Sequence, residues 1–190
     1  MLKVLEIQEP VHEKIELDEY ITLKIRWPEN ELSYVDDKLY WHTGDLKSSL
    51  LEIGMSAKTG VLRSLTIVSV KSVKFGTFEM TSHNQTEYGL PIFCTASWPG
   101  TKPEPKPETN NTGSRNRKNH IFDQGIFEMQ CGIDKIDLVI SRKACQKSIN
   151  SGRVSFGLDS ENCVANIVVF DLCEDEMNKI VDTIKNQLPK

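Results

Sequence analysis

The sequence predicts a mainly β fold of the α+β class: two tandem, related antiparallel β-meander repeats followed by a C-terminal amphipathic helix. In Leu50–Val70, two β-rich runs flank a polar turn closed by Gly60, which is typical of a β-hairpin. Val154–Leu172 repeats the order of apolar run, glycine, polar turn and apolar run. Apolar residues at three- and four-residue steps in 177–188 indicate the helix.

The first repeat is expected to contain further strands before its hairpin. Leu2–Ile7 alternates apolar and polar residues and stops at Pro10, which cannot donate to a central ladder. Tyr20–Trp27 places its apolar side chains on one face and its polar ones on the other, as in a half-buried strand. A short aromatic strand is predicted at 39–41, and the sheet is expected to break at 42–45.

The segment that follows the first repeat changes abruptly in composition. Residues 99–119 contain no large apolar side chain and cannot bury enough surface to offset the entropy of ordering. We therefore divide the chain into a β-rich repeat at 1–98, a flexible linker or long loop at 99–120, and a second β-rich repeat with the helix at 121–190. Periodicity does not distinguish one continuous sheet from a sandwich or a closed barrel.

The C-terminal segment has the signals of a helix. Asp171 and Glu174 have capping-box spacing, and acidic residues gather in the first predicted turn, where they complement the helix dipole. Its apolar stripe predicts that the helix covers an open face of the sheet. The stripe consists of Met177, Ile180, Val181, Ile184 and Leu188.

Composition excludes several classes of protein. With 190 residues, 38% hydrophobic and 26% charged, the chain is typical of a globular domain, and no apolar run approaches the roughly 20 residues that span a bilayer. Glu6 interrupts the apolar start, which argues against a signal peptide. The five cysteines are odd in number and have no Cys-x-x-Cys spacing, so we expect free thiols and a cytoplasmic location.

Charge and its distribution favour a protein partner over nucleic acid. The net charge of −4 argues against unspecific binding to phosphate backbones. Residues 1–40 hold ten acidic and five basic side chains, and residues 159–176 hold six acidic and no basic ones. Acidic surfaces of this kind attract basic partners.

Catalytic, metal and cofactor sites are not predicted. His42, His83, His120 and Cys94 lack the close spacing of zinc ligands, and no glycine-rich phosphate loop is present. Acidic pairs such as Asp36 and Asp37, or Asp134 and Asp137, lie where turns use aspartate to bond their own backbone. No cysteine has a histidine or a glycine-rich elbow near it in sequence.

Aromatic residues beside acidic turns are the predicted contact residues. Tryptophan next to acidic groups is a good anchor in protein interfaces, and Trp41 at the end of its strand fits this better than Trp27, whose phase places it in the core. The predicted partner-binding residues are Glu29, Glu31, Asp36, Asp37, Trp41 and His42.

Two functions are compatible with these observations. The first is a non-enzymatic cytoplasmic binding protein, for example a bacterial immunity protein that neutralises a basic toxin through an acidic surface. The second is a small hydrolase or ligand-binding protein whose site lies between the two repeats and uses residues such as Asp36, His42 and Asp134. A cleft with clustered titratable groups favours the second, and an exposed acidic face with aromatics favours the first.

Overall fold

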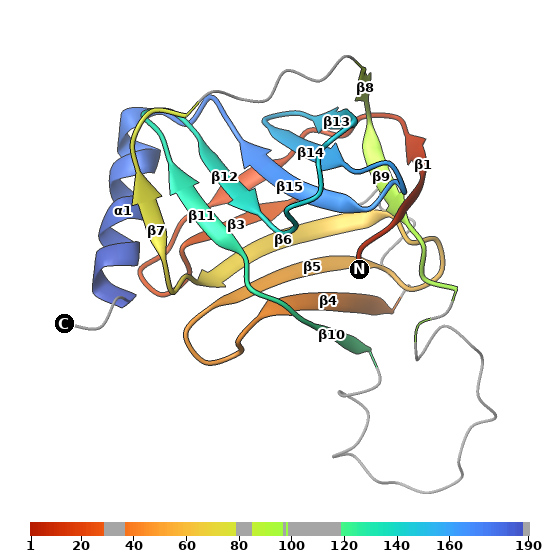
Figure 1. Cartoon of the computed structure of the whole chain (residues 1–190), viewed down its shortest axis with the longest axis horizontal. Coiled ribbons are helices and arrows are strands. Elements are labelled where there is room, and N and C mark those ends of the chain that lie inside the picture. The colour runs from red at the N-terminus through yellow and green to blue at the C-terminus, as the bar shows by residue number, and fades with distance from the viewer. Residues whose placement is uncertain (29–36, 79–84, 97, 99–118, 188–190) are drawn as a thin grey trace, which may run out of the picture.

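The structure is a computed structural model that describes residues 1–28, 37–78, 85–96, 98 and 119–187. Within these residues it confirms the mainly β prediction, with fifteen strands in three sheets and one C-terminal helix (Figure 1). The elements are β1 (Val4–Gln8), β2 (Lys14–Glu16), β3 (Leu23–Arg26), β4 (Lys38–Gly44), β5 (Leu50–Ser56), β6 (Leu62–Ser69), β7 (Val73–Phe75), β8 (Thr86–Tyr88), β9 (Leu90–Phe93), β10 (His120–Gln124), β11 (Glu128–Cys131), β12 (Ile136–Val139), β13 (Lys147–Ser151), β14 (Val154–Leu158), β15 (Val164–Val169) and α1 (Glu174–Gln187).

Two large sheets pack face to face around one hydrophobic core. The six-stranded sheet has the order β10-β4-β5-β6-β3-β2, and the seven-stranded sheet has the order β7-β11-β12-β15-β14-β13-β8. Trp27, directly after β3, packs against Phe156 of β14, with ring centroids 6.3 Å apart. Buried residues of both sheets form a single cluster, so the arrangement is a β-sandwich.

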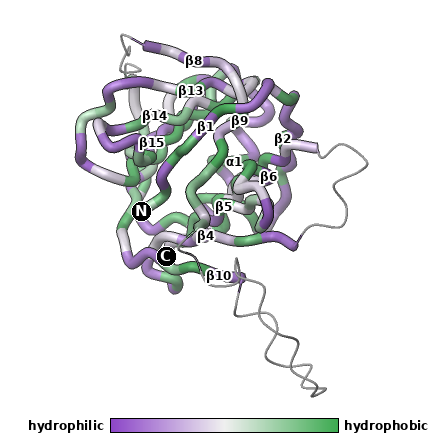
Figure 2. The backbone as a smooth tube through the Cα atoms, turned by 90° about the vertical axis from the view of Figure 1, so that its right-hand side faces the viewer, coloured by the Kyte–Doolittle hydropathy of each residue, from purple (hydrophilic) through white to green (hydrophobic). Residues whose placement is uncertain are grey.

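A two-stranded sheet of β1 and β9 closes one side of the sandwich (Figure 1). The Val4 amide donates to the Asn162 carbonyl in the turn of the second hairpin, and the Phe93 amide donates to the Gly60 carbonyl in the turn of the first. Each of these two strands therefore anchors one hairpin turn. The outlying β8 is mainly hydrophilic, whereas hydrophobic segments lie toward the middle of the molecule (Figure 2).

Both predicted hairpins are confirmed. β5 pairs antiparallel with β6, and β14 pairs antiparallel with β15. Gly60 has a φ of +74°, a conformation that glycine adopts without a Cβ penalty. A Cβ at Gly60 would lie 2.2 Å from the Phe93 carbonyl oxygen, so both the turn and its contact with β9 require glycine.

The two large sheets share a strand order. The five strands β2, β3, β6, β5, β4 and the five strands β11, β12, β15, β14, β13 both follow the sequence first, second, fifth, fourth, third. In each hairpin a register shift follows the glycine of its first strand, Gly54 in one and Gly157 in the other. This is a finding about topology, and the internal repeat stays a prediction.

The predicted halves of the chain are interleaved in the structure. β10 from the second half pairs in parallel with β4, and β7 and β8 from the first half pair in parallel with β11 and β13. Most of the predicted linker, residues 99–118, lies outside the described residues. No helix in the described part of the chain is long and apolar enough to cross a membrane.

The expected break of the sheet at residues 42–45 is wrong for its first part. β4 continues through His42 and Thr43 to Gly44, and it is paired along this length with β5 on one side and β10 on the other. The partners of Thr43 and Gly44 on β10 are Asp123 and Gln124, which lie about 80 residues further along the chain. Tertiary pairing therefore overrides the local turn preference.

The C-terminal helix is confirmed, and it packs at one end of the sandwich (Figure 1). Met177, Ile180 and Ile184 face the core, and the Thr183 hydroxyl donates to the Asp18 carbonyl. The predicted cap at Asp171 and Glu174 is wrong by two residues. The helix begins at Glu174, and the Glu176 carboxylate accepts from the Cys173 amide, which is the capping-box bond from the third helical residue.

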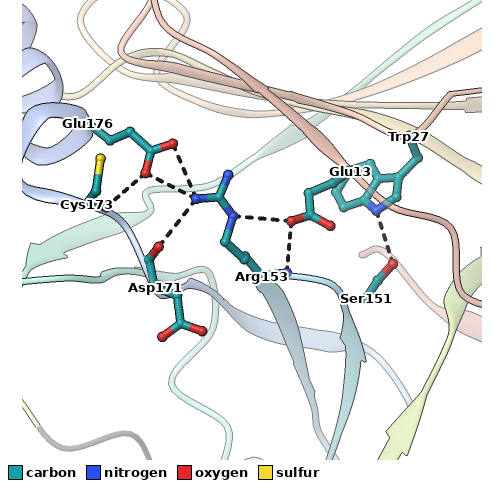
Figure 3. A network of polar contacts seen from close by, with 7 residues as sticks. All are labelled: Glu13, Trp27, Ser151, Arg153, Asp171, Cys173 and Glu176. Atoms are coloured by element: carbon teal, nitrogen blue, oxygen red, sulfur yellow. Dashed lines mark hydrogen bonds and ion pairs between the residues drawn. The ribbon is translucent and has the colours of Figure 1, made fainter.

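A cluster of polar contacts around Arg153 ties this helix to the sheets (Figure 3). The guanidinium pairs with Glu13, 3.3 Å from Nε to Oε1, and with Glu176, 3.1 Å from Nη1 to Oε2. It also donates to the Asp171 carbonyl oxygen. One side chain in the turn between β13 and β14 thus contacts both the segment before β2 and the first turn of α1.

Candidate functional site

The outer face of the six-stranded sheet carries the candidate site. Alternation along its strands turns one set of side chains into the core, namely Leu23, Ile25, Leu39, Trp41, Leu51, Ile53, Leu65 and Ile67. The other set forms two rows across the strands. The first row is Lys14, Arg26, Ser64, Gly54, Tyr40 and His120, and the second row is Glu16, Lys24, Thr66, Glu52, His42 and Phe122.

Four aromatic rings stack at the β4–β10 end of these rows, and we call them the ring ladder: Tyr40, His120, His42 and Phe122. Ring centroids are 5.1 Å apart for Tyr40 and His120, 5.1 Å for His42 and His120, and 4.8 Å for His42 and Phe122. The rings of each pair lie within 18° of parallel. The parallel pairing of β4 with β10 places these side chains opposite each other.

His42 is held within the ladder by a carboxylate. Its Nε2 lies 2.9 Å from Oε2 of Glu52, the residue opposite it on β5. The side chain is only 5% exposed, and its Nδ1 has no hydrogen-bond partner among the described residues. Glu52 therefore keeps one oxygen for His42 and remains partly accessible as an acceptor.

Tyr40 is partly buried beside the same carboxylate. Burial raises the pKa of the Tyr40 hydroxyl above its usual value, and the charge of Glu52 raises this pKa further. The hydroxyl consequently stays protonated through the neutral range and can donate a hydrogen bond.

A groove of about 670 Å³ runs beside Tyr40 over the outer face, and we call it the outer groove. Among the described residues its lining holds five basic and two acidic side chains, a formal charge of +3 on a chain whose net charge is −4. The lining residues are Lys14, Glu16, Lys24, Arg26, Trp27, Pro28, Lys38, Tyr40, Glu52, Arg63 and Ser64.

One acidic residue of the groove orients two of its cations. Oε2 of Glu16 lies 3.1 Å from Nε of Arg26, and Oε1 lies 3.6 Å from Nζ of Lys14. Both cations are more than half exposed in these pairs. Within the described ranges Lys24, which lies between Glu16 and Thr66 in the second row, forms no ion pair.

The structure places the sequence-predicted contact residues in different environments. Trp41 is 2% exposed and its Nε1 donates to Oδ2 of Asp123 at 2.8 Å, so its ring fills the core instead of forming a surface anchor. His42 is buried in the ring ladder, and Asp37 is exposed just before β4. Glu29, Glu31 and Asp36 lie outside the described residues. The partner-binding role of this set stays a prediction.

The alternative set of site residues is not brought together in the described structure. His42 lies in the six-stranded sheet, whereas Asp134 lies in the turn that precedes β12 of the other sheet, where its carbonyl accepts from the Leu172 amide. Asp36 and His83 lie outside the described residues. Within the described part of the chain, no group of three or more His, Cys, Asp or Glu side chains could hold a metal ion.

Sequence reasoning missed the outer groove, although part of its signal was present. The alternation of Tyr20–Trp27 already assigned Lys24 and Arg26 to the solvent face. Their neighbours Ser64, Glu52 and Tyr40 come from three other strands, and only the register of those strands places them in the same rows. No protein-family model matches the sequence, and no curated protein matches it.

Proposed function

We propose that this protein is a non-enzymatic binding protein that holds an anionic ligand in the outer groove. The observation that carries the proposal is the +3 formal charge of the groove lining on an acidic chain. A cleft lined by one sign of charge concentrates ligands of the opposite sign and speeds their association. The volume of about 670 Å³ lies within the range of small-molecule sites.

The cations on β2 and β3 are arranged to bind an anion directly. Glu16 contacts Arg26 through Nε, so the terminal nitrogens of the guanidinium stay available for a forked contact with phosphate or carboxylate. Lys24 and Lys14 stand beside it as point charges. Glu52 lies at the other side of the groove, where its Oε2 contacts Nε2 of His42.

Calorimetry with inorganic pyrophosphate tests this proposal. We expect binding at low salt that weakens as salt rises, because screening shortens the reach of exposed charges. The variant Lys24→Gln/Arg26→Gln should bind at least about tenfold more weakly, a loss of about 1.4 kcal/mol. The matched control Lys3→Gln/Lys47→Gln removes two exposed charges outside the groove and should bind within about twofold of the wild type. Equal loss in both variants would contradict a groove site.

This proposal keeps the ligand-binding half of the second sequence-based hypothesis and changes the place of the site. The hypothesis put the site between the two repeats, whereas the groove lies on the outer face of one sheet. Four strands of that sheet, β2 to β5, supply most of its lining.

A second candidate is the interaction with a basic protein, such as a toxin that the chain neutralises. A hollow of about 520 Å³ between α1 and the segment before β3 supports it, because three acidic side chains and one basic side chain, Lys179, line the hollow beside Tyr20, which is 82% exposed. These acidic residues are Asp18, Glu19 and Asp182. Exposed tyrosine beside acidic groups is suited to anchoring a basic partner.

A pull-down from the native cell at low salt tests the second candidate. A basic protein that the wild type retains and Tyr20→Ala/Glu19→Gln loses would support it. The control Tyr88→Ala/Glu9→Gln removes an exposed tyrosine and an exposed carboxylate elsewhere and should retain the same protein. Retention by both variants, or no basic protein at all, would contradict this candidate.

A further inference from the structure

The Tyr40 ring lines the outer groove, and one of its two faces is covered by His120. The neighbours of β4 are β10 on one side and β5 on the other. The Tyr40 ring stacks on His120 of β10, with centroids 5.1 Å apart and planes 18° apart. The opposite face of the ring is therefore directed toward β5, where Gly54 is the paired residue.

The floor beside that face lacks large side chains. Gly54 has none, and the Ser64 hydroxyl lies 2.4 Å from the place where a Cβ of Gly54 would stand. The same Cβ position is 3.3 Å from Cε1 of Tyr40. Any side chain at this position would crowd both neighbours, so Gly54 keeps a shallow floor with a hydroxyl between Tyr40 and the cations of β3.

Along the first row, the outer groove thus has the Tyr40 ring at one end and the Arg26 guanidinium at the other. Tyr40 and Arg26 are three strand spacings apart, and at about 4.8 Å per strand this is roughly 14 Å between their Cα atoms. Gly54 and Ser64 are the two residues between them. This distance accommodates a flat ring and an anionic group side by side.

Glu52 restricts the orientation of such a ligand in the outer groove. Glu52 lies next to Tyr40 in the adjacent row, and Lys24 lies two strands away in the same row as Glu52. An anion is repelled at the Glu52 end and attracted at the Lys24 end. A group close to Glu52 must instead donate a hydrogen bond, as an amino group, a ring N–H or a hydroxyl does.

We propose that the outer groove binds a mononucleotide, with its base stacked on the face of Tyr40 directed toward β5, above Gly54, and its phosphate on Arg26 and Lys24. The inference rests on the proposed function and specifies the ligand class of the same site. The base extends the ring ladder by one ring, and its donors or the ribose hydroxyls face Glu52. Stacking of a base on an aromatic ring tolerates all four bases, so we expect little discrimination among them.

The test is calorimetry with AMP, GMP, CMP and UMP, compared with ribose 5-phosphate, which carries the phosphate without a base. At least one nucleotide should bind about tenfold or more tighter than ribose 5-phosphate, since stacking contributes substantially to affinity. Amide shifts in NMR spectra should place the bound nucleotide at Gly54 and Ser64. Tyr40→Leu should reduce nucleotide affinity to that of ribose 5-phosphate and leave ribose 5-phosphate binding unchanged.

Two further variants make the outcomes distinguishable. Tyr40→Phe keeps the ring and should keep nucleotide binding within about threefold, which also shows that the Tyr40→Leu effect comes from the ring and not from misfolding. Lys24→Gln/Arg26→Gln should weaken nucleotides and ribose 5-phosphate together. If ribose 5-phosphate binds as tightly as every nucleotide, the base-stacking inference is wrong and the anion site stands. If pyrophosphate binds but neither the nucleotides nor ribose 5-phosphate do, the mononucleotide inference is wrong and the anion site stands. If pyrophosphate does not bind either, both proposals are wrong.

Discussion

Nε1 of Trp27 donates a hydrogen bond to Oγ of Ser151 at 3.0 Å, and this bond joins the two sheets of the sandwich inside the core (Figure 3). Trp27 follows β3 in the six-stranded sheet and Ser151 ends β13 in the seven-stranded one. Both residues are at most 2% exposed. The bond lets a large aromatic ring with a polar atom fill the core without an unpaired donor.

Ser151→Ala should destabilise the protein by about 1–3 kcal/mol, because the buried indole N–H loses its acceptor. Trp27→Phe/Ser151→Ala removes both polar partners and should cost less than the sum of the two single variants. Urea unfolding of the wild type, both single variants and the double variant measures this difference. Additive costs would show that the bond contributes no coupling between the sheets.

Arg153→Met should destabilise the protein by about 3 kcal/mol, the lower end of the range for a broken buried pair, because the guanidinium is one-third exposed. The cost arises from Glu13, whose side chain is 7% exposed and loses its cation. Glu13→Gln/Arg153→Met should recover part of this loss in thermal unfolding. The control Arg142→Met removes an arginine that is 94% exposed and should change stability by less than about 0.5 kcal/mol.

Gly60→Ala should destabilise the protein by more than the roughly 1–2 kcal/mol of a left-handed backbone, because the added Cβ meets the Phe93 carbonyl oxygen. Gly76→Ala is the matched comparison, since its φ of +154° is also unfavourable for alanine but no atom lies within 4 Å of the new Cβ. Chemical unfolding of both variants separates the cost of the unfavourable backbone conformation from the cost of the contact with the Phe93 carbonyl oxygen. A smaller cost at Gly60 than at Gly76 would contradict the close contact with β9.

The thiols should react at different rates. Burial raises the pKa of Cys131 to about 11, whereas Cys173 is exposed. Since the thiolate is the reactive form, Cys173 should be modified first by a thiol reagent near neutral pH, and Cys131 should react only as the protein unfolds. Mass spectrometry of peptides after brief labelling measures the order. Fast labelling of Cys131 in the folded protein would contradict its buried position.

Cys131 should also make stability depend on pH in the alkaline range. Between about pH 9 and 11 the unfolded thiol loses its proton while the folded one keeps it, so the unfolded state binds fewer protons. The free energy of unfolding then falls as pH rises, by at most about 1.4 kcal/mol per pH unit from this group. Cys131→Val lacks this contribution, and the difference between wild type and variant in urea unfolding across this range isolates it. A constant difference would contradict the raised pKa.

Local patterns predicted the elements of the fold well. The alternation in Tyr20–Trp27, the turn at Gly60 and the helical periodicity after residue 174 each depend on neighbouring residues alone. The misplaced helix cap shows the limit of such patterns. Asp171 and Glu174 have the right spacing, but the chain uses Cys173 and Glu176. Glu176 also pairs with Arg153, which lies in the turn before β14.

The candidate site was less accessible to sequence reasoning. Trp41 at the end of an aromatic run favoured a surface anchor, yet its indole is buried and donates to the partly exposed carboxylate of Asp123 on β10. His42 was expected in a turn, and the pairing of β10 with β4 makes it part of a strand and of the ring ladder. Both differences arise from one long-range parallel pairing that no local pattern encodes.

The sequence alone determined most of the strand segments, the turn of the first hairpin and the C-terminal helix, because these follow from side-chain period and turn chemistry within a few residues. It did not predict β13, since residues 141–151 were expected to form a loop or one helical turn. The tertiary structure decided the order and register of the strands. Register places Tyr40, Gly54, Ser64 and Arg26 in one row, and shifting any strand by a single residue would turn its side chains to the opposite face. The outer groove exists only because pairings between distant segments fixed that register.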